Sequence, residues 1–153
     1  MNEDLNTLNL KTLISLSEKA LTLDYDNILM FNSKADSTNT YKKAYGYYAD
    51  LGIIGNHVIY IENRNGNSNP RTLQDETLTR MFKLLDVQQI KIKAFRADST
   101  SYLYNVLRLV EKKSDYFYIK ARMNAAVARA INDIECWEKI ETATDTIYLG
   151  EIQ

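Results

Sequence analysis

The sequence predicts a mixed β-sheet flanked by helices. Two observations carry this prediction: strand-like segments are concentrated in the first half of the chain, and helix-like and strand-like segments alternate after it. The composition, with 45% hydrophobic and 25% charged residues, is that of an ordinary folded protein. A length of 153 residues corresponds to about one domain.

The first half is predicted to contain a helical segment and then three strands. Leucines at loose helical spacing mark a helix at residues 5–19, within an N-terminal segment of residues 1–20. The strands are expected at residues 21–31, 47–54 and 57–62. Gly55-Asn56 is typical of a hairpin turn between the last two, and the asparagine-rich residues 62–70 are expected to be irregular. We therefore expect a three-strand meander.

The second half is predicted to alternate between helices and strands. In chain order these segments are a helix after residue 72, a strand at 90–95, a helix at 103–110, a strand at 116–120, a helix at 123–134 and a strand at 146–152. Thr72 is the expected cap of the first helix, and residues 98–101 offer capping side chains to the second. The apolar stripes at 103–110 and 123–134 are both expected in the core.

Several classes of site and location are excluded or disfavoured by composition. Cys136 is the only cysteine and His57 the only histidine, so an internal disulfide is impossible and a zinc site is disfavoured. Apolar runs are too short to span a membrane, and the acidic residues after Met1 do not suit a signal peptide, so we expect a cytoplasmic protein. Carboxylates remain as the candidate catalytic groups.

Two acidic positions are candidates for a metal site. Asp24 and Asp26 lie two apart on the first predicted strand and so share a face, while Asp98 follows the strand at 90–95. If these strands are neighbours, Asp26 and Asp98 converge, and a divalent cation such as Mg²⁺ would relieve their repulsion. The alternative is that Asp98 is only a helix cap and that Asp24 and Asp26 keep a strand soluble.

Four segments together resemble a subgroup of bacterial insertion-sequence DDE transposases: Leu23–Asn27, Thr40–Tyr47, Tyr60–Asn67 and Phe95–Ser99. The resemblance covers roughly residues 21–152. It implies an RNase H-like catalytic domain, whose usual order is a meander followed by alternating helices and strands. It further implies Asp26 as the first metal ligand, Asp98 as the second and Asp24 as the substitute for the first. Mg²⁺ would be the cofactor, insertion-sequence ends the DNA partner, and DNA strand cleavage and transfer the reaction.

The sequence also departs from this family. Ile28 stands where the family has a threonine soon after the first Asp, and Ser99 and Thr100 stand where a glycine is usual soon after the second. The family's catalytic Glu is not identified, and Glu135, Glu138 and Glu141 have no assigned role. We therefore expect an inactive, truncated copy, a partial RNase H-like domain at residues 21–153 that is incomplete at its C-terminus. An incomplete core of this kind would favour self-association.

Cations and aromatic residues that suit DNA lie in three places. Tyr41, Lys42, Lys43 and Tyr45 combine phosphate contacts with base stacking, Arg64 lies in the asparagine-rich segment, and Arg96 precedes Asp98. The alternatives are tyrosines in the core with lysines in water, and a salt bridge for Arg96. Two other functions therefore stay open: a non-catalytic remnant that binds DNA or protein, and an unrelated small α/β domain in which the aspartates are caps.

Overall fold

The computed structural model describes Asn6 and residues 20–152. The chain divides into two compact units, Met1–Lys120 and Ala121–Gln153. The helix predicted at residues 5–19 lies, apart from Asn6, outside the described residues. Within the described part of the chain, no helix is both long and apolar enough to span a membrane.

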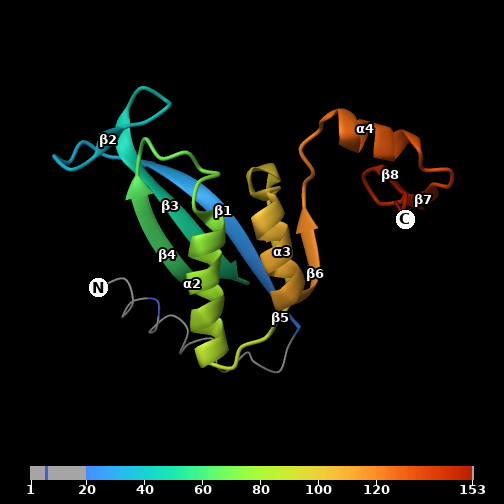
Figure 1. Ribbon diagram of the computed structural model, residues 1–153, viewed down its shortest axis with the longest axis horizontal. Coiled ribbons are helices and arrows are strands. Elements are labelled where there is room, and N and C mark those ends of the chain that lie inside the picture. The colour runs from blue at the N-terminus through green and yellow to red at the C-terminus, as the bar shows by residue number, and fades with distance from the viewer. Residues whose placement is uncertain (1–5, 7–19, 153) are drawn as a thin grey trace. The chain divides into compact units, whose positions relative to one another are not determined.

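The first unit is built on a mixed sheet. Its strands are β1 (Leu21–Phe31), β2 (Thr38–Asn39), β3 (Tyr45–Ile54), β4 (His57–Asn65), β5 (Ile92–Ala97) and β6 (Ser114–Ile119). The order is β2-β3-β1-β5-β6, and β4 also pairs with β3 (Figure 1). β1, β3 and β4 form the antiparallel meander, whereas β5 is parallel to β1 and β6 is parallel to β5. The predicted fold class, a mixed sheet with a three-strand meander followed by alternating helices and strands, is confirmed for this unit.

Helices α2 (Gln74–Val87) and α3 (Tyr104–Lys113) cover one face of this sheet (Figure 1). Buried and more exposed side chains alternate along β1, and this alternation shows which face of the sheet the helices cover. Leu21, Leu23 and Tyr25 are buried, and the residues between them are more exposed. α2 contributes a buried stripe at helical spacing, and α3 contributes Val106 and Val110. The core therefore lies between the sheet and these two helices.

Two local predictions in the first unit are wrong. β4 continues to Asn65, so residues 62–65 are strand, because their backbone pairs with residues 47–50 of β3. Thr72 does not cap α2; the N-cap is Leu73, which has a positive φ of 61° and makes no side-chain capping bond. The Gly55-Asn56 turn between β3 and β4 is found as predicted, and Gly55 has the positive φ that such a turn requires.

The second unit contains α4 (Ala125–Asn132), β7 (Glu138–Glu141) and β8 (Thr146–Leu149). Asn124 caps α4 by accepting hydrogen bonds from the N–H groups of Ala126 and Val127, and β7 and β8 form an antiparallel pair. The expectation that the stripe at residues 123–134 is core is wrong, since α4 has no buried residue and Met123 is 66% exposed. The β7 strand was not predicted.

The core and the sheet edge should respond differently to the loss of an aromatic ring. Phe95 is fully buried against Tyr25 and Phe82, whereas its register partner Phe117 on β6 is 41% exposed. We expect Phe95→Ala to lower the free energy of unfolding by about 3–5 kcal/mol. The matched change Phe117→Ala should cost about 1 kcal/mol or less. Urea unfolding followed by circular dichroism measures both, and equal losses would contradict this placement of the core.

Candidate active site

The candidate site lies where β5 ends beside the middle of its parallel neighbour β1. Their register pairs Asp24 with Arg96 and Tyr25 with Ala97, so Asp26 and Asp98 directly follow the last pair. The predicted neighbourhood of the two strands is therefore confirmed. Carboxyl ends of parallel strands are a frequent place for ligand sites in open α/β sheets. The convergence of the two carboxylates themselves remains a prediction.

Asp98 is exposed and fixes the chain as it leaves β5. Its carboxylate accepts hydrogen bonds from the Thr100 N–H at 2.8 Å and from the Thr100 hydroxyl at 3.0 Å. It thereby caps the short 3₁₀ helix η2 (Ser99–Ser101), whereas α3 has Leu103 as its N-cap. The capping role predicted for residues 98–101 is thus found on η2 instead of on the longer helix. A capped, oriented carboxylate retains further lone pairs for a cation.

The two acids of β1 have different surroundings. Asp24 forms a paired contact with the Arg96 guanidinium, with Nε–Oδ1 and Nη2–Oδ2 distances of 2.5 and 2.7 Å. Asp26 is exposed, and its carboxylate accepts a hydrogen bond from the N–H of the next residue, Asn27, at 2.8 Å. Because Arg96 neutralises Asp24, the geometry favours Asp26 over Asp24 as the ligand of a cation.

The chemistry of Asp26 and Asp98 suits a hard divalent cation. Mg²⁺ in proteins commonly takes one or two carboxylates and fills its remaining positions with water and phosphate oxygens. Across the residues that the structure describes, no group of three or more His, Cys, Asp or Glu side chains forms a candidate metal site. A cation at Asp26 and Asp98 would therefore take its remaining ligands from water and phosphate oxygens.

A buried polar network, which the sequence analysis missed, adjoins this end of β1. Asp50 of β3 is fully buried, and the Arg64 Nη2 atom lies 2.6 Å from both of its carboxylate oxygens. Asn27 and the Thr77 hydroxyl also donate hydrogen bonds to Asp50. Glu62 of β4 extends the network. The signal was present in the strand alternation, because Asn27 and Asp50 occupy inward positions where apolar residues are expected.

Burial acts to raise the pKa values of the carboxyl groups in this network, whereas hydrogen bonds and ion pairs act to lower them. Burial raises the pKa of Asp50 above its usual value, although Arg64 and Asn27 stabilise the charged form. At Glu62, burial also acts to raise the pKa, but hydrogen bonds from Arg80 and Tyr60 outweigh it and lower the pKa. Burial, together with the hydrogen bond to Glu62, raises the pKa of Tyr60 to about 12. These carboxylates therefore belong to structural ion pairs.

The predicted DNA-contacting tyrosines and lysines lie at the tip of the hairpin between β2 and β3. The Thr40 N–H donates to the Ala44 carbonyl at 2.8 Å, which closes the turn. Lys42 and Lys43 are exposed, as are Tyr41 (68%) and Tyr45 (61%). The Lys42 ammonium lies 5.5 Å from the centre of the Tyr41 ring. The tip thus presents cations and aromatic rings to solvent, as a nucleic-acid contact would require.

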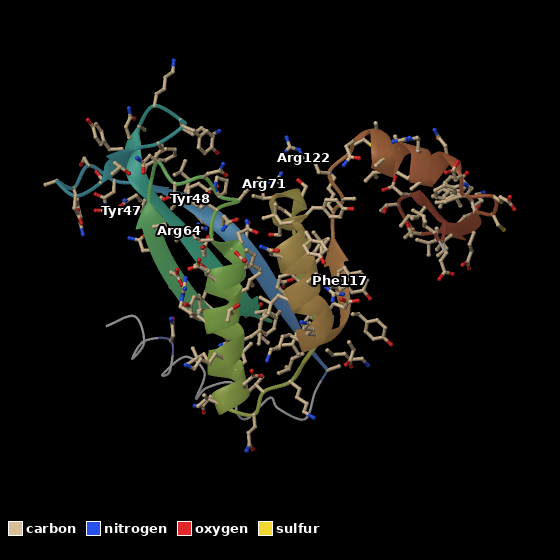
Figure 2. All side chains as sticks on the ribbon, viewed as in Figure 1. Tyr47, Tyr48, Arg64, Arg71, Phe117 and Arg122 are labelled. Carbon is tan, nitrogen blue, oxygen red and sulfur yellow. The ribbon has the colours of Figure 1, made fainter. Side chains whose placement is uncertain are left out.

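The two arginines predicted to meet DNA have protein partners. Only 9% of the Arg64 side chain is exposed, and its guanidinium contacts Asp50 and the Thr72 carbonyl. Figure 2 shows Arg64 between the sheet and the start of α2. The assignment of Arg64 as a phosphate contact therefore does not fit its position, because burial removes the guanidinium from solvent. Arg96 is exposed and forms the salt bridge considered in the sequence analysis as the alternative.

No family model matches this sequence, and no curated protein matches it either. Among solved structures, the chain is similar to the Mos1 transposase paired-end complex with the left transposon end, at 11% identity and a TM-score of 0.49, over 76% of this chain and 41% of that one. It is also similar to the catalytic domain of Mos1 mariner transposase, at 11% identity and a TM-score of 0.49, over 84% of this chain and 64% of that one. The Mos1 strand transfer complex is similar at 13% identity and a TM-score of 0.48, over 84% of this chain and 44% of that one. The matches thus span 41 to 64% of the length of these structures.

A paramagnetic ion tests whether the two aspartates converge. We expect the carboxylate oxygens of Asp26 and Asp98 to lie within about 8 Å of each other, near enough to share a cation. Mn²⁺ added to the isotope-labelled protein should then broaden the amide signals of residues 26–28 and 98–100 together. Asp26→Asn should suppress both effects, and Asp115→Asn, at the opposite end of the sheet, should suppress neither. Broadening of one segment without the other would contradict a shared site.

Proposed function

We propose that the first unit derives from a metal-dependent DNA transposase domain, in which DNA strands are cut and joined beside the carboxyl end of β5, where it adjoins β1. The observation that carries this proposal is the placement of Asp26 and Asp98 directly after the last paired residues of two neighbouring parallel strands. The four sequence segments that resemble DDE transposases include both aspartates, in the order that the family has. An unrelated domain with two capping aspartates would not require this neighbourhood.

In this proposal each aspartate has a defined task. Asp26 and Asp98 hold Mg²⁺ through carboxylate oxygens, and the Thr100 hydrogen bonds orient the Asp98 carboxylate. A bound divalent cation would supply charge for a phosphate group and lower the pKa of an attacking water or hydroxyl. Arg96 neutralises Asp24 and thereby limits repulsion between neighbouring carboxylates. The exposed tip residues Tyr41, Lys42 and Lys43 are the candidate contacts for the DNA strand.

A second candidate function, non-catalytic DNA binding, is favoured by the same hairpin tip. Its cations and aromatic rings are exposed and do not depend on a metal. Binding of this kind would not choose among bases, because phosphate contacts and stacking on an aromatic ring are both indifferent to sequence. The two functions are separable, since one depends on Asp26 and Asp98 and the other on the tip.

We expect the chain by itself not to cleave DNA. Among the described residues no group of three or more His, Cys, Asp or Glu side chains could hold a metal, whereas the resemblance implies a catalytic set of three acids. Purified protein, incubated with insertion-sequence end DNA and Mg²⁺ or Mn²⁺, should produce no more nicks than Asp98→Ala. Gel electrophoresis of end-labelled DNA measures the products. Cleavage that disappears in Asp98→Ala would show instead that a further carboxylate completes the site.

DNA binding at the hairpin tip should be weak and sensitive to salt. Two or three phosphate contacts give a decrease of log affinity with log salt concentration at a slope of roughly −2. The Lys42→Ala/Lys43→Ala double variant should flatten this slope. The matched double variant Lys91→Ala/Lys93→Ala, which removes two exposed lysines near the start of β5, should keep it. Fluorescence anisotropy with single-stranded DNA across a salt series is the measurement. Tight, sequence-selective binding at high salt would contradict this expectation.

A further inference from the structure

The part of β1 that carries Asp26 is paired on one side only. β1 pairs with β5 up to Tyr25, whereas its pairing with β3 continues from Leu23 to Phe31. Asp26 is therefore the first residue of β1 without a ladder partner on β5. Its side chain is exposed. Another interaction is needed to hold this position of the strand.

Asn27, the next residue, supplies such an interaction on the inner face of the sheet. Its amide nitrogen donates to Asp50 Oδ1 and, at 3.3 Å, to the Tyr25 hydroxyl. Its amide oxygen accepts a hydrogen bond from Gln74 Nε2 at 3.2 Å. The side-chain amide thus engages both of its N–H groups and its oxygen, which determines its orientation. It joins β1 to β3 and to the start of α2.

The partners of Asn27 are themselves held firmly. Asp50 is fully buried and lies 2.6 Å from Arg64, whose guanidinium also reaches the Thr72 carbonyl. Gln74 is 1% exposed and donates to the Pro70 carbonyl at 2.7 Å. Asn27 is therefore anchored to β3, β4 and the segment before α2. The net contribution of such a buried ion pair to the free energy of unfolding is small, because desolvation offsets much of the attraction between the two charges.

We propose that Asn27 is a positioning residue for Asp26, which it holds in register through the buried Asp50–Arg64 pair. This inference rests on the proposed function, in which Asp26 binds a divalent cation. Asn27 does not touch the cation site: its side chain points to the inner face of the sheet and that of Asp26 to the opposite face. It acts through the backbone that the two residues share. Groups that orient the ligands of a metal typically change its affinity 10- to 100-fold when they are removed.

The test compares Asn27→Ala with Tyr60→Phe in the full chain. Tyr60→Phe is the matched control, because it removes a buried hydrogen bond to Glu62 on the same face, from a strand that does not pair with β1. Two properties are measured for each variant: amide hydrogen exchange along the chain, and the Mn²⁺ dissociation constant by calorimetry. Hydrogen exchange reports how well the backbone amides of β1 are protected, and it requires no metal. The two readouts therefore separate this inference from the proposed function.

Asn27→Ala is expected to speed exchange at residues 26–29 about tenfold more than at the core residues of β5, and to weaken Mn²⁺ binding about tenfold or more. Tyr60→Phe should change neither by more than about twofold. A uniform increase of exchange over the whole sheet would overturn the inference, since Asn27 would then serve general stability only. If the wild-type protein binds Mn²⁺, a dissociation constant that is the same in Asn27→Ala would also overturn the inference.

Two other results have defined consequences. If the wild-type protein binds no Mn²⁺, the proposed metal function fails, and the exchange pattern alone decides whether Asn27 fixes the Asp26 segment. If Asn27→Ala does not fold, Asn27→Ser is used in its place, because a serine hydroxyl keeps one of the hydrogen bonds. Local exchange at residues 26–29 that matches the wild type in Asn27→Ser would overturn the inference.

Discussion

The double pairing of β1 is the constraint on which the first unit depends. β1 is antiparallel to β3 on one side and parallel to β5 on the other, so it joins the meander to the alternating half of the chain. A parallel neighbour requires a crossover, and α2 provides it between β4 and β5. The same pairing places Asp26 beside the end of β5, and with it the candidate active site.

The face of the sheet under α2 has two chemically different halves. At the amino end of β1 it is apolar, with Leu21 and Leu23 packed against the helices. Toward the carboxyl end it becomes polar, with Asn27, Asp50 and Arg64 in place of hydrophobic side chains. Burying a charge is costly even when it is paired. The buried charges lie next to Asp26, the residue of β1 that is proposed to bind a cation. Because their burial is costly and lies beside this residue, we assign the network a positioning role.

The candidate site and the candidate DNA contact lie on different elements. The aspartates are fixed by a strand ladder and by the η2 cap, whereas the cations and tyrosines project from the tip of the β2–β3 hairpin. A rigid sheet can hold two carboxylates at a set separation, and an exposed turn can adapt to a flexible nucleic-acid strand. Their separation also means that either function could be retained without the other.

The sequence by itself determined the fold class and the positions of most strands and helices, because alternation and helical spacing record which side of an element is buried. It also placed Asp26 on the first strand and Asp98 just after the end of a later one. Only the tertiary structure decided the roles of the polar side chains. Arg64 lies in an asparagine-rich segment typical of loops, yet pairing with β3 makes its first part a strand and turns the guanidinium inward to Asp50. Burial of a polar side chain depends on partners distant in sequence, and no local pattern records them.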